Sequence, residues 1–524
     1  MEAHAITIEK PFSHSSEVFA LLVDRLGGSE VAGLPHGEVE QMMKTEGFEL
    51  LRVLFEDHLN LRAQAMPAEC AVTGSDGETR THRRKMPRKL MTIFGMVELH
   101  ARTGWRGDGV DTLCPLDAEL NLPPVIDSHG VRRRIAELAS KCSFDAVAVE
   151  LGKSSGATVG KRQLEALTHV VSRDFDDYYA EAAADAVDAA ATVLVGGVDA
   201  TGIAMRPEAL REITRRLREA DRAMETAVGE RWPKPKAASN MRRNGMRMAS
   251  VSVVYEVEPY VRDAQDILRE LRPVGIVSTK KPRPRAQAKR VSASVIKPME
   301  FVVGETFDEM QRRDPQHAKR WVVLLDGCEH QLAYVEAEAQ RRGITVTIIV
   351  DFIHVAQYVW GAAKVLVPDD ETARRLWVAE KLTHVLWGDA STAAAAMRRS
   401  ATKRGLPDNE RAAVDTCAGY LLKYKAYLRY DEALRDGLPI TTGAVEGACR
   451  HLVKDRMDIT GARWGLETAE AVLRLRGLAA SGDIDDYFDF HEARELQRNH
   501  LSRYANNKPP ALARPGKPLL RVVR

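Results

Sequence analysis

Three acidic residues stand where two strands end and a helix begins, and such positions can bring carboxylates together. Asp199 ends the apolar run TVLVGGVD, and Asp326 ends the run WVVLLD. Glu446 lies in TTGAVEGACRHLVKDRM, a segment typical of the first turn of a helix. Two Mg²⁺ ions about 3.5–4 Å apart can activate a water and stabilise the leaving oxygen of a phosphodiester. Because water and phosphate complete the coordination of Mg²⁺, three carboxylates are sufficient protein ligands. We therefore expect these three residues to bind metal.

A second acidic strand end lies close by in the sequence, in the motif Asp351-Phe-Ile-His354. Asp351 is a rival to Asp326 for the second ligand position. Asp326 is favoured because its strand is expected to neighbour the strand that carries Asp199. His354 could touch the substrate, or it could fix the strand end through a hydrogen bond. We expect Asp351 and His354 to be accessory residues.

The helix of Glu446 has an apolar stripe and a charged stripe. The spacing of Val445, Cys449 and Leu452 predicts that these side chains face the sheet. Beside them, Glu446 is expected to reach the metal, whereas Arg450 and Lys454 are expected to face the phosphate backbone. The alternative is that Glu446 and Arg450 form an ordinary surface ion pair between residues i and i+4.

A sheet is needed to position these residues. We expect strands at residues 192–199, 249–257, 299–304, 321–326 and 344–351, with helices between the later ones. Three consecutive strands can form an antiparallel meander, and strands separated by helices can add in parallel through right-handed crossovers. The pattern therefore predicts an α/β fold with a mixed sheet. Residues 355–437 are expected to form an all-helical insertion before the helix of Glu446.

The chain before the sheet is expected to be mostly helical. Apolar residues at spacings of three and four predict helices over residues 16–65, and alternation around Phe94-Gly95 predicts a β-hairpin. The segment CPLDAELNLPP is expected to be a loop. Three short helices are expected over residues 128–171, with Ser128 as an N-cap.

The last two of these helices fit a helix-turn-helix. They are joined at a Ser-Ser-Gly turn, and Lys161 and Arg162 stand near the start of the second one. A DNA-reading helix would place such residues against the duplex. The alternative is a plain helical hairpin whose basic residues are solvated.

A strongly basic segment, TKKPRPRAQAKR, interrupts the predicted sheet. Six of its twelve residues are Lys or Arg and none is acidic. This composition favours a disordered phosphate-binding arm over Lys280–Arg290 that would use Lys280, Lys281, Arg283 and Arg285. The alternative is a solvated linker.

Composition excludes several classes of protein. The six cysteines form no CxxC pair, which argues against a structural zinc site and against a disulfide framework. No signal-peptide pattern and no apolar run of membrane-spanning length are present in the sequence, so we expect a cytoplasmic protein. The domains we expect are 1–80 helical, 81–127 hairpin and loop, 128–185 helix-turn-helix, 186–354 first part of the catalytic domain, 355–437 insertion, 438–490 final catalytic helices, and 491–524 a basic tail.

Several motifs carry a family resemblance. They are GVDATG, VVLLDGCEHQ, VDFIHVAQYVWGAAK, and above all GLPITTGAVEGACRHLVKDRM followed by GARWGLETAEAVLRLRGL. Upstream motifs of the same kind are RKLMTIFGMVELHARTGW, PLDAELNLPP and SFDAVAVELGKSSGATVGKRQLEAL. Together, over roughly residues 85–490, the chain resembles the ISKra-type insertion-sequence transposases, which are bacterial DNA transposases. Ala200 and Gly447 depart from the Gly and Ser common in that family, and neither change removes a ligand.

The resemblance implies an RNase H-like catalytic domain with an Asp-Asp-Glu triad on Asp199, Asp326 and Glu446. It implies Mg²⁺, for which Mn²⁺ can substitute, and the partners would be terminal inverted repeats and target DNA. Joining two DNA ends implies a homodimer or a larger assembly on DNA in the bacterial cytoplasm, near the nucleoid. Two alternatives stay open: an RNase H-like nuclease without strand transfer, and an inactive DNA-binding descendant of a transposase.

Overall fold

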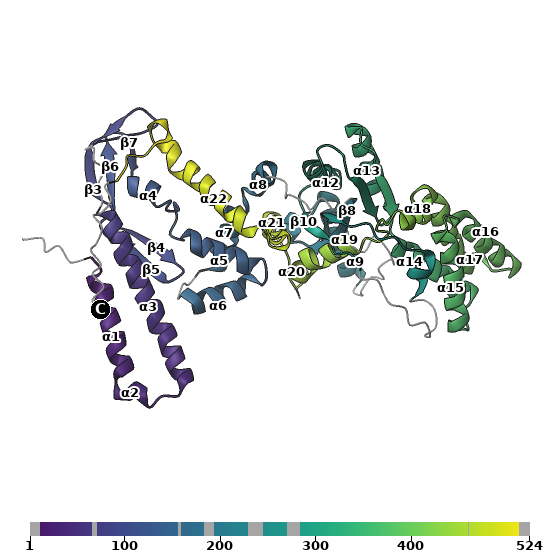
Figure 1. Ribbon diagram of the computed structural model, residues 1–524, viewed down its shortest axis with the longest axis horizontal. Coiled ribbons are helices and arrows are strands. Elements are labelled where there is room, and N and C mark those ends of the chain that lie inside the picture. Colours follow the sequence, from purple (N-terminus) through teal and green to yellow (C-terminus); the bar gives the residue numbers. More distant parts are fainter. Residues whose placement is uncertain are drawn as a thin grey trace, which may run out of the picture. The chain divides into compact units, whose positions relative to one another are not determined.

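The computed structural model describes residues 11–64, 71–155, 159–182, 193–228, 245–269, 283–459 and 461–512. The chain forms two compact units (Figure 1). We call Glu181–Asp483 the central unit, and Met1–Ala180 together with Ile484–Arg524 the terminal unit. Of the described helices, none is both long enough and apolar enough to cross a membrane.

The central unit contains a five-stranded sheet with the order β10-β9-β8-β11-β12. Its strands are β8 (Val193–Ala204), β9 (Met246–Val257), β10 (Gln287–Ser294), β11 (Arg320–Leu325) and β12 (Thr347–Val350). Strands β8, β9 and β10 pair antiparallel, and β11 runs parallel to both β8 and β12. The prediction of a mixed sheet, with an antiparallel meander followed by parallel strands, is confirmed.

The prediction for the third strand is wrong. Residues 299–304 begin helix α12 (Met299–Arg313), and Pro298 stands at its N-cap. The buried side chains of α12 recur at helical spacing, as Val302, Thr306 and Met310 show. The third strand, β10, instead begins at Gln287, near the end of the predicted basic arm Lys280–Arg290, and continues past it to Ser294. A short apolar run does not distinguish a strand from a buried helix, and the packing of α12 decides the matter.

Helices cover both faces of this sheet, as the two adjacent glycines of β8 reveal. A Cβ on Gly196 would lie 2.8 Å from Met310 Sδ, whereas a Cβ on Gly197 would lie 3.5 Å from Val445 Cβ. Because successive residues of a strand point to opposite faces, α12 lies on one face, and helix α19 (Gly443–Ala448), which carries Glu446, lies on the other. The core between α12 and the sheet includes Leu194 and Phe307.

The rest of the central unit is helical. Between the strands lie α9 (Glu212–Val228), α11 (Ala264–Leu268) and α13 (Glu329–Arg342). The segment between β12 and α19 is helical, as predicted, and holds α14 (Phe352–Leu366), α15 (Glu371–Leu386), α16 (Ala390–Lys403), α17 (Asp408–Lys423) and α18 (Tyr430–Arg435). After α19 come a π-helical segment (Cys449–Lys454), α20 (Asp455–Met457) and α21 (Leu466–Ser481).

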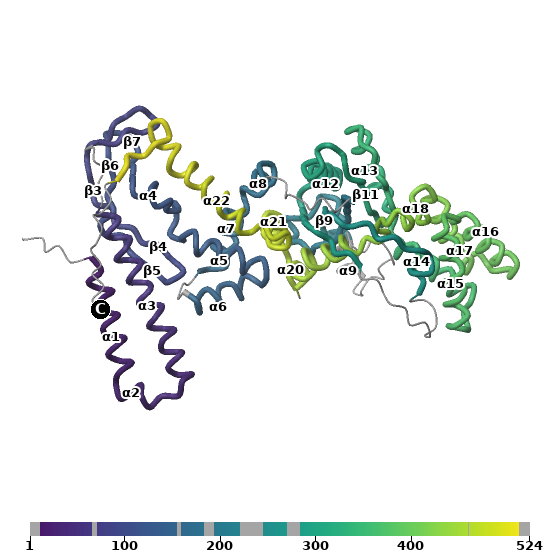
Figure 2. The backbone as a smooth tube through the Cα atoms, viewed as in Figure 1, coloured from purple at the N-terminus to yellow at the C-terminus, as the bar shows by residue number. Residues whose placement is uncertain are grey.

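The terminal unit begins with the predicted helices. Figure 2 shows α1 (Ser13–Gly27) and the long α3 (His36–Ala63), which contact each other and are joined through α2 (Ser29–Ala32). The predicted hairpin is confirmed as β4 (Arg88–Thr92) and β5 (Gly95–Leu99). Other short strands are β1 (Val72–Thr73), β2 (Thr79–Arg80), β3 (His82–Lys85), β6 (Thr103–Gly107) and β7 (Val110–Leu113).

Three short helices follow, as predicted: α5 (His129–Ala139), α6 (Phe144–Ser155) and α7 (Lys161–Ser172). Ser128 caps α5, because its hydroxyl accepts a hydrogen bond from Val131 N at 3.2 Å. The predicted turn at Ser154–Gly156 is partly wrong, because α6 continues through Ser155, and Gly156 lies outside the described residues. The predicted loop at CPLDAELNLPP is also wrong in part. It contains α4 (Pro115–Glu119), which Pro115 can begin because its missing N–H is not needed there.

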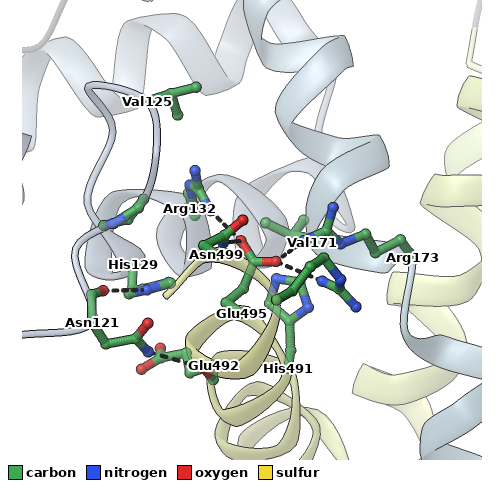
Figure 3. A network of polar contacts seen from close by, with 12 residues as sticks. Asn121, Val125, His129, Arg132, Val171, Arg173, His491, Glu492, Glu495 and Asn499 are labelled. Atoms are coloured by element: carbon green, nitrogen blue, oxygen red, sulfur yellow. Dashed lines mark hydrogen bonds and ion pairs between the residues drawn. The ribbon is translucent and has the colours of Figure 1, made fainter. Parts of the chain in front are cut away.

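The boundary near the C-terminus differs from the expectation. Helix α22 (Ile484–Asn499) runs through the expected boundary at residue 490, and it belongs to the terminal unit. Its Tyr487 hydroxyl donates a hydrogen bond to Val171 O at 2.7 Å, and its Glu495 pairs with Arg132 at 3.1 Å (Figure 3). These bonds tie α22 to α7 and α5. The last part of the expected basic tail, residues 513–524, lies outside the described residues.

Candidate functional site

Three aspartates on neighbouring parallel strands come to one level of the sheet, with Asp199 inside β8 and with Asp326 and Asp351 directly after β11 and β12. Leu324 of β11 pairs with Gly197 of β8, so two residues further on Asp326 comes level with Asp199. Leu325 pairs with Val350 of β12, so one residue further on Asp326 also comes level with Asp351. Because alternate residues share a face, Asp199 lies on the face of Gly197, which is the face that α19 covers. The expectation that Asp199 ends its strand is wrong, because β8 continues to Ala204, but the register still brings Asp199 level with Asp326 at the end of β11.

Helix α19 brings Glu446 to the same face. The predicted apolar stripe is confirmed, since Val445, Cys449 and Leu452 are all buried. Glu446 itself is exposed. The Cys449 thiol donates a hydrogen bond to Asp199 Oδ2 at 3.3 Å, which ties the helical stretch that carries Glu446 to the middle of β8. A π-helical segment begins at Cys449, and such wide turns frequently mark functional sites.

Asp199 is half-buried among polar groups. Its Oδ1 accepts a hydrogen bond from Ala200 N at 2.6 Å, in addition to the thiol bond at Oδ2. Burial raises the pKa of Asp199, and the two hydrogen bonds oppose this shift. The nearby Asp326 carboxylate raises the pKa further, whereas His354 lowers it. Repulsion between two carboxylates that share a site is relieved when a cation binds between them.

Asp326 is held by its backbone and offers a side-chain oxygen. Its Oδ1 accepts a hydrogen bond from Cys328 N at 2.9 Å. The Tyr420 hydroxyl donates to Asp326 O at 3.1 Å, and the Tyr424 hydroxyl donates to Gly327 O. Gly327 has a φ of 90°, and a Cβ there would collide with the Tyr420 hydroxyl. The helical insertion therefore fixes the strand end, while Oδ2 of Asp326 has no hydrogen-bond partner within the described segments.

Asp351 is fully buried and already satisfied, unlike Asp326. Its Oδ1 accepts from Ile353 N at 3.3 Å and from Thr442 N at 3.1 Å. Its Oδ2 accepts from His354 N at 3.2 Å and contacts His354 Nδ1 at 2.9 Å. Asp351 is the N-cap of α14, so the Asp351–His354 motif begins a helix. These bonds orient α14, His354 and the turn before α19, and they leave little capacity for a metal.

His354 lies among the carboxylates with its ring one-third exposed. The hydrogen bond to Asp351 raises the pKa of His354, burial opposes this, and the charges of Asp351, Asp326 and Glu446 raise it further. A protonated imidazole here could pair with a phosphate oxygen. These charge interactions place His354 close to Asp351, Asp326 and Glu446.

Two different sets of side chains could serve as the metal ligands. The ligand atoms of Asp351, His354 and Glu446 all lie within 4.8 Å of one another, whereas Asp199, Asp326 and Glu446 do not form such a group in the described part of the chain. We favour the second set because Mg²⁺ prefers accessible carboxylate oxygens, and Asp351 is saturated. Two ions about 3.5–4 Å apart also require carboxylates that are more widely spread than those around one ion.

The cations predicted to face DNA are exposed where the structure describes them. Arg450 and Lys454 are exposed, and Arg450 lies 4.0 Å from Asp455, so the alternative of a Glu446–Arg450 surface pair finds no support in the described residues. Lys161 pairs with Asp145 at 3.0 Å on the surface, and Arg162 is exposed. Lys280 and Lys281 lie outside the described residues, whereas Arg283 and Arg285 are described and exposed.

The expectation of a disordered arm through Arg290 is wrong at its end. Gln287–Ser294 forms strand β10, and Arg290 is buried. Its guanidinium pairs with Glu309 at 3.0 Å and with Asp483 at 3.3 Å. Ion pairs with residues outside the segment therefore stabilise this basic residue in a buried position within the sheet.

A second acidic group, Asp174, His491 and Glu495, also has its ligand atoms within 4.8 Å of one another. Figure 3 shows Glu495 and His491 beside Arg132 and Arg173. Arginines pair with both Glu495 oxygens, and Asp174 accepts from His491 Nδ1 at 2.6 Å. Because these guanidinium groups repel cations, the group is an ion-pair network rather than a metal site.

The sequence reasoning missed four contributors to the site. Thr442 donates its backbone N–H to Asp351 and its hydroxyl to Glu446 Oε1, the latter at 3.3 Å. Cys449 was recognised only as a core residue. Tyr420 and Tyr424 reach the site from the insertion, and nothing in their local sequence marks them. Thr442 stands four residues before Glu446, so helical spacing could have identified it.

The comparisons with known proteins found no match, either to a protein-family model or to a curated protein.

Proposed function

We propose that this chain is a DDE-type DNA transposase whose triad is Asp199, Asp326 and Glu446. The observation that carries the proposal is the strand register, since Leu324 opposite Gly197 brings Asp326 level with Asp199 beneath α19. The strand order, with three antiparallel strands followed by two parallel ones between layers of helices, is the arrangement expected of an RNase H-like domain. The motif resemblance to ISKra-type transposases agrees with both features.

The donor set fits a hard divalent cation. Asp326 offers Oδ2, which has no partner among the described residues, Glu446 is exposed, and Asp199 is destabilised as a charged group by burial and by Asp326. These oxygens suit Mg²⁺, with Mn²⁺ as a substitute, better than they suit a thiolate-seeking metal. Once bound, the metal supplies an activated water and charge stabilisation at the phosphodiester.

The other residues position DNA and the triad. Tyr420 and Tyr424 hold the backbone of Asp326 and Gly327, and Asp351 orients His354 and Thr442 through its hydrogen bonds. The exposed Arg450 and Lys454, which follow Glu446 on the same helical stretch, bind the phosphate backbone next to the scissile bond. In the terminal unit, Lys161 and Arg162 of α7 bind the terminal inverted repeats. Joining two ends needs at least a dimer on DNA.

The proposal is tested by incubating the full chain with DNA that carries the candidate element ends, with and without Mg²⁺, and by mapping the nicks. A transposase cuts at the element ends and joins the freed 3′-hydroxyl to target DNA. Cutting without joining would identify a nuclease, and specific end binding without any cutting would identify an inactive descendant. Absence of both binding and cutting would contradict the proposal.

A further inference from the structure

The terminal unit contains a cavity of about 530 Å³ whose lining is strongly basic. It lies where the start of β4, the loop before β6, and the end of α22 meet. Four arginines face it together with one histidine and one carboxylate, and these six are Arg88, Arg102, Asp117, Arg498, His500 and Arg503. Neither the triad nor the predicted helix-turn-helix uses any of them.

The single carboxylate does not balance the arginines around it. Arg102 donates to both oxygens of Asp117, at 2.7 and 2.6 Å, and Arg88 lies 3.6 Å from the same carboxylate. Burial lowers the pKa of the Arg88 guanidinium, Asp117 opposes this, and the positive charge of Arg102 adds to the lowering. One acid therefore serves two guanidinium groups inside a half-buried space.

Arg503 adds charge that the described protein barely compensates. Its guanidinium donates to the backbone carbonyl of Thr112 at 3.1 Å. Its ion-pair partner among the described residues is Asp111 at 3.9 Å, and that side chain is 90% exposed. Water screens such an exposed partner, so it contributes little. By contrast, Arg498 on the same wall is already paired with Asp174 at 2.6 Å and Glu495 at 2.7 Å.

We propose that this cavity binds a phosphate group, with Arg503 and the Arg88–Arg102 pair as its donors. Planar guanidinium groups form paired hydrogen bonds with phosphate oxygens, and a dianion or a phosphodiester supplies the missing negative charge. The space is larger than a phosphate alone requires, so the group can be part of a nucleic-acid strand or a free phosphate compound. The site is separate from the proposed catalytic centre, and its test does not depend on cleavage.

The first measurement titrates the full chain with inorganic phosphate in chloride buffer without divalent metal, and follows binding by calorimetry. Arg503→Gln should weaken phosphate binding by about tenfold, since it removes a charge-assisted donor. Arg503→Lys keeps the charge and should retain part of the affinity. The matched control is Arg25→Gln, which also removes an exposed arginine paired with one carboxylate, and it should bind phosphate as the unchanged chain does.

The second measurement uses a labelled random-sequence duplex and separates the two sources of phosphate. Weaker duplex binding by Arg503→Gln, with the slope of log affinity against log salt reduced by about one, identifies the DNA backbone as the occupant. Unchanged duplex binding with weakened phosphate binding identifies a free phosphate compound. If the unchanged chain, Arg503→Gln and Arg25→Gln do not differ for either probe, the proposal is overturned.

Discussion

The Cys449 thiol donates a hydrogen bond to Oδ2 of Asp199 at 3.3 Å, and so joins the helical stretch of Glu446 to the first strand of the sheet. Burial raises the pKa of the Cys449 thiol, and the negative charge of Asp199 raises it further. The thiol therefore stays protonated near neutral pH and serves as a hydrogen-bond donor. This neutral hydrogen bond holds the helical stretch that carries Glu446 against Asp199, and so it links the segments of two proposed ligands.

This relationship predicts the order in which the cysteines react. Iodoacetamide alkylates only the thiolate form of a cysteine. Each unit by which the pKa of the thiol rises lowers the thiolate fraction tenfold. We expect iodoacetamide to modify Cys449 more than about tenfold more slowly than the partly exposed Cys142 and Cys328, as measured by mass spectrometry of peptides. In urea the three rates should become similar. Rapid modification of Cys449 in the folded chain would show that its hydrogen bond to Asp199 is not maintained.

The proposed DNA-binding role of α7 is tested by replacing Lys161 and Arg162 together with alanine. Both residues are exposed, so we expect normal folding. Affinity for the element ends should fall, and the slope of log affinity against log salt should decrease by about two, because fewer counterions are released. Arg25→Ala is the control. An unchanged slope in the double variant would make α5, α6 and α7 a structural bundle only.

The basic segment before and within β10 should divide into two kinds of arginine. Arg290→Ala removes one partner each from Glu309 and Asp483, while Arg313 still pairs with Glu309 at 2.6 Å, so we expect the central unit to lose about 1–3 kcal/mol of stability in urea unfolding. Arg283→Ala and Arg285→Ala, which change exposed residues, should change stability by less than about 0.5 kcal/mol and weaken binding to any DNA sequence. Equal stability losses in the two sets would contradict the buried position of Arg290.

We expect the terminal unit to lose stability as pH falls, because His129 must then bind a proton. Burial, and then the charge of Arg132, lowers the pKa of His129 to about 4, and its Nε2 donates to Asn121 O at 2.9 Å. The unfolded chain binds this proton near pH 6.5, so the stabilising contribution is complete above about pH 6.5 and is lost as pH falls toward 4. Between pH 7 and 5 the loss should be on the order of 1–2 kcal/mol.

The measurement for His129 is hydrogen exchange of peptides from α5 and α22, corrected for the intrinsic effect of pH. His129→Gln should lose less protection between pH 7 and 5 than the unchanged chain does. The buried His491 and His500, whose pKa values burial also lowers, keep part of the acid sensitivity in this variant. An identical loss of protection in both proteins would contradict the role of His129.

The parts of the fold that follow from local pattern were predictable from the sequence. The runs ending in Asp199, Asp326 and Asp351 are almost continuously apolar, and the hairpin at Phe94-Gly95 alternates, so periodicity locates them. Strand β10 was missed because its basic residues favour a solvated segment, whereas Glu309 and Asp483 draw Arg290 inward. Such partners are distant in the chain, and local pattern cannot reveal them.

The same limit applies to the site. The helical spacing of Val445, Cys449 and Leu452 correctly oriented the helix of Glu446, because burial alone sets that pattern. The saturation of Asp351 depends on Thr442 N, which lies 91 residues further along the chain, so the sequence left its role open. The support of Asp326 by Tyr420, 94 residues away, was invisible for the same reason.

The most direct test of the proposed triad is single-turnover cleavage of end-carrying DNA in Mg²⁺ by four matched variants. Asp199→Asn, Asp326→Asn and Glu446→Gln keep size but remove charge, so each should slow cleavage by at least about 10²–10³-fold. Their end binding should stay close to that of the unchanged chain, because DNA contacts elsewhere are intact. Asp351→Asn keeps size but replaces one accepting oxygen with a donor, so it disturbs the bonds at that atom without removing a proposed metal ligand, and it should cleave faster than any of these three. Cleavage at the unchanged rate by Asp326→Asn, with none by Asp351→Asn, would contradict the assignment.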